Sequence, residues 1–300
     1  MKIVSLLPSA TEIVFALGLG DSLEGVSFEC DFPPEAREKA VVSGTALSVD
    51  PTTPASEIDQ AVRERLAEGE PIYTLDRERI RAIQPDLILA QDLCEVCAVP
   101  SGAVTDALDD LGCSAQVVSL DPVTLEDVIA GIGEVGAATG REAQAADLMA
   151  GLLDRIEDVH DTVAGRRAPR PRVLPLEWSD PPFSAGHWVP AMVDTAGGEC
   201  LLAPPASRSR ALAWDAIAAA RPAIVVFMPC GYHLDRAVAE GRALLDQPAL
   251  AGASEVWAVD ADAYFSRPGP RVVDGVELLA AIVHPDLVGE PDPERATRLR

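Results

Sequence analysis

Residues 1–20 read MKIVSLLPSATEIVFALGLG, and this stretch indicates the order of strands and helices that the rest of the chain repeats. Residues 2–7 (KIVSLL) form a short apolar run that predicts a β-strand. Residues 8–11 predict a turn, and a helix is expected from Thr11 to Leu17, ending at Gly18 or Gly20. The sequence therefore opens with a strand, a tight turn and a helix.

The same alternation continues through the first half of the chain. Residues 43–56 have the composition of a loop, while Ile58, Val62 and Leu66 recur at the helical interval of four. Alternating strands and helices predict an α/β fold with a mostly parallel sheet covered on both faces. The expected strands are 23–28, 86–90 and 116–120, and the expected helices are 56–68, 76–83 and 101–111.

A change of pattern follows, with one helix expected at 124–140 and a second at 141–165. The second would be roughly 35 Å long at 1.5 Å per residue. Strand and helix alternation then resumes with a strand at 172–178 and a helix at about 190–196. We therefore expect an N-terminal α/β lobe (1–140), a bridging helix (141–165) and a C-terminal α/β lobe (166–300).

The two halves also echo each other. IRAIQPDLILAQDLC (80–94) is similar to IAAARPAIVVFMPCG (217–231), and KIVSLLP matches RVLPLEW at the opening of each half. Self-similarity is common among α/β proteins, but the pattern favours two similar Rossmann-like lobes joined by a long helix.

Charge limits the possible partners. The chain has 48 acidic and 24 basic residues, a formal net charge of −24, and only two lysines. Such a surface repels nucleic acid and anionic lipid. It suits a salty solvent, although a GC-rich genome would also favour arginine over lysine. No run reaches the roughly 20 apolar residues needed to cross a bilayer.

Four segments resemble a known family. They are KIVSLLPSATEIVFALGLGDSLEGVSFECDFPPEA, RIRAIQPDLILA, PPFSAG…MVDTAGGE and YFSRPGPRVVDGVELLAAIVHPD. Together they resemble the class III substrate-binding proteins of importers for vitamin B12, haem and ferric siderophores, most closely the cobalamin-binding ones. The resemblance implies two lobes bridged by one rigid helix, a ligand cleft between them, and a cleft position for Arg267.

Two features depart from that family. The opening residues are interrupted by polar side chains and lack a small-residue cleavage site, so we expect a cytoplasmic protein; a start codon further upstream would make it extracytoplasmic. The second departure is QDLCEVCAVP (91–100), which is outside the family pattern. Cys94 and Cys97 could be packed hydrophobes, ligands of zinc or of a cofactor metal, or a redox pair.

Ligands of parallel sheets collect beyond the carboxyl ends of the strands. We predict ligand contacts there. If Cys94 and Cys97 bind a metal, Cys30, His187 or His233 would have to complete the ligand set. The predicted ligand-binding residues are Pro8, Ser9, Phe28, Cys30, Trp178, Phe183, Trp188, Tyr232, Phe265 and Arg267. The aromatic residues of this set would either face a flat macrocycle or fill the core.

The sequence lacks the common enzyme motifs. The main hypothesis is a non-catalytic binding protein for a cobalamin-like corrinoid or another metal-tetrapyrrole, without a nucleic-acid partner. One alternative is a metal- or thiol-dependent enzyme using Cys94 and Cys97. The other is the ferric-siderophore-binding component of an ABC importer, which would have a transporter permease as partner.

Overall fold

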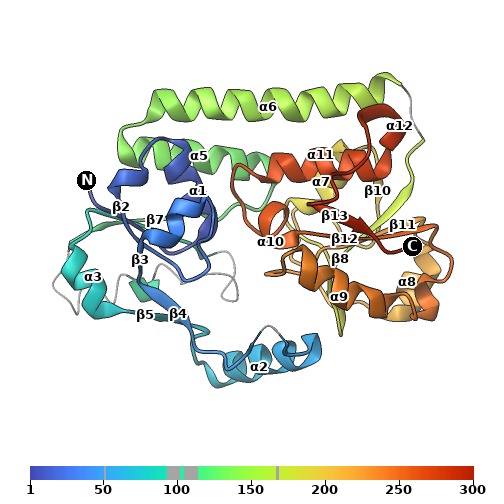
Figure 1. Cartoon of the computed structure of the whole chain (residues 1–300), viewed down its shortest axis with the longest axis horizontal. Helices are drawn as coiled ribbons and strands as arrows, with labels where there is room; N and C mark the ends of the chain where they lie inside the picture. Colours follow the sequence, from blue (N-terminus) through green and yellow to red (C-terminus); the bar gives the residue numbers. More distant parts are fainter. Residues whose placement is uncertain (51, 93–101, 105–113, 167–168) are drawn as a thin grey trace. The chain divides into compact units, whose positions relative to one another are not determined.

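A computed structural model describes all of the chain except residues 51, 93–101, 105–113 and 167–168. The chain divides into two compact units (Figure 1). Unit 1 comprises residues 1–122 and 129–150, and unit 2 comprises residues 123–128 and 151–300. The predicted α/β class is confirmed in both, and each unit is described by itself.

Unit 1 is built on a five-stranded sheet in the order β3-β2-β1-β6-β7, in which every neighbouring pair is parallel. Its strands are short apolar runs, and Ile3, Val4 and Ile88 are fully buried. Burial on both faces explains why the central strands β1 and β6 read as continuous hydrophobic segments. The strands are β1 (Ile3–Ser5), β2 (Leu23–Val26), β3 (Ala40–Val41), β6 (Leu87–Ala90) and β7 (Gln116–Ser119).

The helices of unit 1 begin and end where local chemistry places them. Helix α1 starts at Pro8, three residues earlier than expected, because proline fits the first helical position. The Asp76 side chain accepts a hydrogen bond from the backbone N–H of Arg79 and caps α3. These helices are α1 (Pro8–Ala16), α2 (Ala55–Glu68) and α3 (Arg77–Ile83), with short 3₁₀ turns at Gly20–Ser22 and Pro34–Glu38; residues 102–104 are also helical.

A small excursion leaves the main body of unit 1 between β4 (Ser43–Thr45) and β5 (Tyr73–Leu75), which pair antiparallel. Helix α2 lies within it, and Ala55 is its only buried residue. The base of the excursion is closed by the backbone N–H of Ala46, which donates to the carbonyl of Ile72 at 2.7 Å. Residues 43–56 were expected to form a loop. The first three of them instead form β4, which pairs with β5.

Unit 2 repeats the architecture with the sheet order β10-β8-β11-β12-β13. Strands β10, β8, β11 and β12 are parallel, β13 closes one edge antiparallel, and β9 forms a hairpin with β8. The strands are β8 (Arg172–Ser179), β9 (Pro182–Ser184), β10 (Glu199–Cys200), β11 (Ile224–Phe227), β12 (Glu255–Val259) and β13 (Ala296–Arg298).

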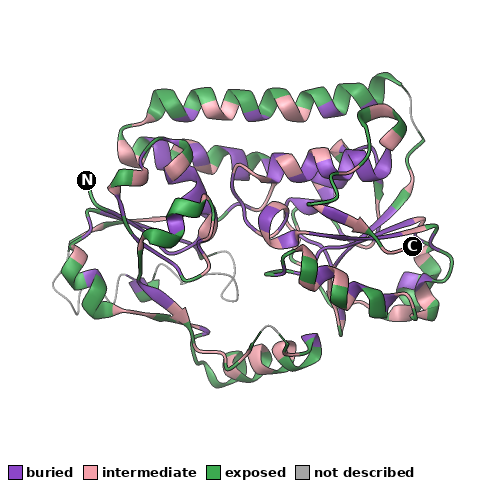
Figure 2. Ribbon diagram, viewed as in Figure 1, coloured by how far each residue is buried: buried purple, intermediate pink, exposed green. Residues whose placement is uncertain are grey.

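The helices of unit 2 include α11, which is buried along nearly its whole length (Figure 2). Its sequence VVDGVELLAAIV is apolar except for Asp274 and Glu277, as expected of a helix that is largely enclosed in a core. The helices are α7 (Val189–Thr195), α8 (Trp214–Ala220), α9 (Leu234–Leu244), α10 (Ala261–Tyr264), α11 (Val272–Val283) and α12 (Pro285–Val288), with a 3₁₀ turn at Pro248–Leu250.

The echo between the two halves has a structural counterpart. Strands β2-β1-β6-β7 of unit 1 have the same order as β10-β8-β11-β12 of unit 2. The helices before β6 and β11 both end at a left-handed residue, Gln84 (φ 52°) and Arg221 (φ 45°), and a proline follows each. Because proline disfavours helical geometry in the preceding residue, the same device ends both helices.

Two further helices, α5 (Leu125–Thr139) and α6 (Glu142–Gly165), match the predicted ranges within two residues. The division between the units falls inside α6, after residue 150, and the predicted lobe boundaries at 140 and 166 remain predictions. Within the described residues, no helix is both long and apolar enough to cross a membrane.

One ion-pair cluster fixes the second half of α6 within unit 2. The Arg155 guanidinium donates two hydrogen bonds to Glu277 and one to Asp274, all between 2.7 and 2.8 Å, and both acceptors lie on α11. Hydrogen bonding to Glu277 is the largest cause of the raised pKa of Arg155. A fork-to-fork arginine–carboxylate pair fixes direction as well as distance, so it sets the register of α6 against α11.

Candidate functional site

The carboxyl end of β2 in unit 1 presents two phenylalanines. Phe28 and Phe32 are 41% and 42% exposed, whereas Cys30 between them is buried. The Cys30 sulfur lies 3.1 Å from the Thr11 hydroxyl, which pins this loop to α1. Aromatic side chains are enriched at binding interfaces. The predicted contact Phe28 is thus accessible, and Phe32 joins it.

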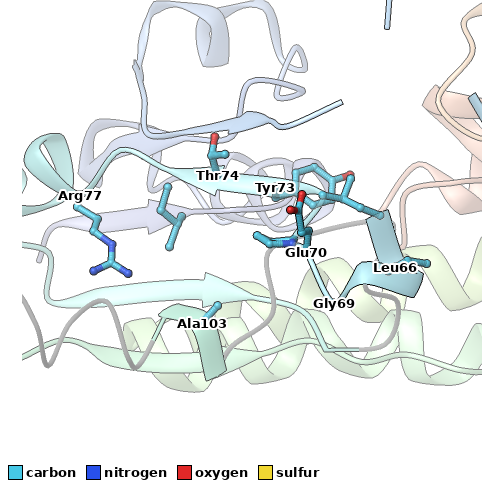
Figure 3. Close-up of a pocket in the computed structure, with 10 residues that line it drawn as sticks. Leu66, Gly69, Glu70, Tyr73, Thr74, Arg77 and Ala103 are labelled. Atoms are coloured by element: carbon cyan, nitrogen blue, oxygen red, sulfur yellow. The ribbon is translucent and has the colours of Figure 1, made fainter. Parts of the chain in front are cut away.

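A hollow in unit 1 lies next to this loop. The ring of Tyr73 on β5 is 6.2 Å, centroid to centroid, from the ring of Phe28. Tyr73 also lines a mostly apolar hollow of about 550 Å³ between β5, the end of α2 and the start of α3 (Figure 3). The labelled Arg77 and Glu70 bring opposite charges to its wall.

The other predicted residues of unit 1 are less accessible. Pro8 is partly buried as the first residue of α1, and Ser9 is 2% exposed. Cys30, at 5% exposure, is a packed thiol rather than an open ligand. Cys94 and Cys97 lie outside the described residues.

The carboxyl end of β8 in unit 2 carries an aromatic cluster. Trp178 and Phe183 are direct partners across the β8–β9 hairpin, so their side chains lie on the same face. Both are partly buried. The Tyr232 ring meets the Trp178 indole edge-on, with centroids 5.3 Å apart. Tyr232 is 3% exposed, so within this cluster Trp178 and Phe183 have the accessible ring surface.

A charged network lies at the carboxyl ends of β11 and β12. His233 Nδ1 is 3.2 Å from Asp260, and Nε2 is 3.4 Å from Asp262. Arg267, 6% exposed, donates through Nη2 to Asp262. Arg267 therefore neutralises a neighbouring acid in this arrangement, and its predicted contact with ligand remains a prediction. The role of His233 as a metal ligand remains a prediction.

Three predicted residues lie in the interior of unit 2 or away from the strand ends. The Trp188 indole N–H donates to the carbonyl of Phe265 at 2.9 Å, and the two residues are 6% and 2% exposed. His187 follows β9, not β8, because the chain turns back at Asp180 and Pro181. The backbone N–H of Ala185 already donates to the carbonyl of Pro175, four residues before the end of β8.

The His187 imidazole sits in a constrained environment. The backbone of His187 has φ 52°, and its backbone N–H donates to the carbonyl of Ser207 at 2.6 Å. Burial, and then the charge of Arg208, lower the pKa of His187, so the ring is neutral at pH 7. Its role as a metal ligand remains a prediction.

Sequence reasoning missed Phe32, Tyr73, Asp260 and Asp262. The two aspartates could have been found, because they directly follow the apolar strand EVWAV (255–259), to which the strand-end rule applies. Tyr73 could not, since β5 is too short to be recognised. Taken together, the strand ends offer aromatic faces and hydrogen-bonding groups, which suit the holding of a ligand.

The described cysteines differ enough to give a chemical test. Cys230 is exposed, Cys30 is buried, and burial, followed by the charge of Asp194, raises the pKa of Cys200 to about 12. Because the thiolate is the nucleophile, iodoacetamide at pH 8 should modify Cys230 in the native protein and spare the other two. Peptide mass spectrometry reads each site, and unfolding in guanidinium should expose all three. Native labelling of Cys200 as fast as Cys230 would contradict the structure.

The comparisons with known proteins agree with this architecture. A family model described as periplasmic binding protein matches residues 3–253, and the chain belongs to that family. It is a substrate-binding protein of the class used by ABC importers, which confirms the predicted family and the prediction of a binding protein rather than an enzyme.

Two relatives and one structure illustrate the similarity. "Uncharacterized ABC transporter substrate-binding lipoprotein YvrC" of Bacillus subtilis is 26% identical, covering 96% of this chain and 82% of its own. A vitamin B12-binding protein of Vibrio cholerae is 24% identical, covering 92% and 86%. The crystal structure of a periplasmic heme-binding protein from Pseudomonas aeruginosa has a TM-score of 0.70 at 21% identity, covering 97% and 98%.

These findings correct one prediction and leave another without support. The expectation of a cytoplasmic protein is wrong, because the family is one of periplasmic binding proteins and the B. subtilis relative is a lipoprotein. The suggested zinc has no support from the family or from these relatives. The family does bind small-molecule substrates, as predicted.

Proposed function

We propose that this protein is the substrate-binding component of an ABC importer and that its ligand is a cobalamin-type corrinoid. The observation that carries the proposal is the nearly full-length similarity to a vitamin B12-binding protein. As a component of an importer it would deliver the corrinoid to a membrane permease powered by an ATPase.

The side chains at the strand ends support a flat, amide-rich ligand. In unit 2, Trp178 and Phe183 offer ring surface that suits a macrocycle. In unit 1, Phe28 and Phe32 are exposed aromatic side chains. Asp260 provides a carboxylate that can accept hydrogen bonds from amide N–H groups. Haem is the second candidate, favoured by the fold similarity to a heme-binding protein.

Titration of the purified protein with cyanocobalamin, hemin and a ferric hydroxamate tests this proposal. We expect one equivalent of cyanocobalamin to bind, as seen by absorbance and calorimetry, more tightly than the other two. Trp178→Ala should weaken binding by roughly 30-fold, since aromatic anchors contribute about 2 kcal/mol. Trp178→Phe is the matched control, because it keeps an aromatic face, and should remain within about threefold of wild type.

The competing outcomes are distinct. Tight binding of hemin or of the ferric hydroxamate, with no response to cyanocobalamin, would overturn the corrinoid assignment. Equal affinities of Trp178→Ala and wild type would remove Trp178 from the site.

A further inference from the structure

The Trp178 indole packs against the Tyr232 ring, which is itself contacted by a side chain of α9. The Arg236 guanidinium carbon lies 3.8 Å from the centroid of the Tyr232 ring, and the Tyr232 ring in turn meets Trp178. Tyr232 lies just before α9 and Arg236 lies in the first turn of that helix, with its cation over the ring face. A guanidinium over a tyrosine face is attracted by the ring quadrupole, most strongly where water is excluded.

A second contact ties the same helix to the end of β8. The hydroxyl of Ser179, the residue after Trp178, donates to Glu240 on α9. Glu240 lies one helical turn beyond Arg236, so both side chains project from one face of the helix. Burial, and then the Glu240 charge, raise the pKa of Tyr232, so the phenol stays neutral between them. Side chains of α9 therefore contact both Ser179, the residue after Trp178, and the Tyr232 ring that packs against the indole.

We propose that Arg236 and Glu240 are positioning residues that hold the Trp178 indole in one orientation as a platform for the flat face of the ligand. This rests on the proposed function of the strand-end site. An indole fixed before binding loses less rotamer freedom when the ligand arrives, so pre-organisation strengthens binding without adding a contact. Removing the cation or the Ser179 acceptor frees the indole while leaving its contact surface intact.

The main experiment compares Arg236→Met and Glu240→Met with Arg242→Met. Methionine keeps most of the arginine stem and removes the charge, and Arg242 is an exposed residue of the same helix that serves as control. Cyanocobalamin affinity should fall about 10-fold for Arg236→Met and for Glu240→Met, and stay within twofold for Arg242→Met. In a Trp178→Ala background, Arg236→Met should have no further effect, because there is no indole left to position.

A ligand-free readout separates positioning from general stability. With 5-fluorotryptophan incorporated, ¹⁹F NMR should show the Trp178 resonance, assigned by Trp178→Phe, shifted or broadened in Arg236→Met. The Trp188 resonance should not move, because its indole N–H is bound to the carbonyl of Phe265.

Each outcome decides one of the two claims. An unchanged Trp178 resonance in Arg236→Met overturns the positioning role, whatever the protein binds. A full affinity loss for Arg236→Met in the Trp178→Ala background also overturns it, since the effect would not pass through the indole. Failure of the wild type to bind cyanocobalamin, with the expected change in the ligand-free spectrum, overturns the proposed ligand and leaves the positioning role supported.

Discussion

Replacing Gly186 with alanine should lower the free energy of unfolding by about 3 kcal/mol, the upper part of the range for overpacked sites. A Cβ at this position would lie 2.6 Å from the carbonyl oxygen of Ser207, 2.8 Å from the carbonyl carbon of Arg208 and closer still to the backbone N of Ser209. All three are backbone atoms, so no side chain can turn aside to relieve the clash.

The backbone around Gly186 cannot shift cheaply either. The Gly186 N–H donates to Glu177 at 3.3 Å, and the next residue, His187, exchanges hydrogen bonds with Ser207 and Ala206. Moving the two segments apart would therefore break the pairing that holds residues 206–209 beside the chain after β9. The loss would fall on unit 2, which contains all of these residues.

Urea unfolding followed by circular dichroism measures the effect, with Gly252→Ala as the matched control. Gly252 lies in an exposed turn, and a Cβ there meets nothing within 4 Å. That variant should remain within about 0.5 kcal/mol of wild type or gain slightly, because alanine restricts the unfolded chain. Equal stabilities of the two variants would show that residues 207–209 do not lie against Gly186.

The second large effect is expected from salt. A net charge of −24 repels itself in the folded state, and 1 M salt shortens the screening length from about 10 Å at 0.1 M to about 3 Å. Raising NaCl from 0.05 to 1 M should therefore increase the melting temperature by roughly 5–10 °C. Most proteins of balanced charge would show a much smaller rise.

Helix α6 provides the control for this prediction. Asp154, Glu157, Asp158 and Asp161 are all exposed on it, and in the same helix only Arg155 is a strong base. The variant Asp154→Asn/Glu157→Gln/Asp158→Asn should be more stable than wild type in 0.05 M NaCl and gain less from added salt. Thermal scans at both salt concentrations test it, and equal salt responses would show that repulsion on α6 is not the cause.

The sequence was enough for the strands and helices whose pattern depends only on neighbours along the chain. Residues 86–90 and 172–178 could be read as strands because continuous apolar runs are required where both faces of a sheet are covered. The long helix at 141–165 followed from the lack of proline. The predicted start of α1 was wrong, because Pro8 was assigned to a turn whereas it is the first residue of the helix.

The site was less predictable because exposure depends on contacts between distant segments. Phe265 and Trp188 are aromatic residues in loop-like sequence, yet their mutual hydrogen bond lies in the core. The contact between Arg267 and Asp262, five residues away in the sequence, could not be foreseen either. Short strands such as β9 turned the chain back where a loop was expected, which moved His187 away from the strand end.

The excursion between β4 and β5 has a consequence for engineering. Its two ends are joined by the Ala46–Ile72 hydrogen bond, and α2 within it buries a single residue. A foreign domain with adjacent termini could therefore replace the segment between these two residues while the five-stranded sheet stays continuous. Because Tyr73 at its base touches Phe28, a circularly permuted fluorescent protein placed there would sit beside the predicted ligand contacts and could report ligand uptake as a change in emission.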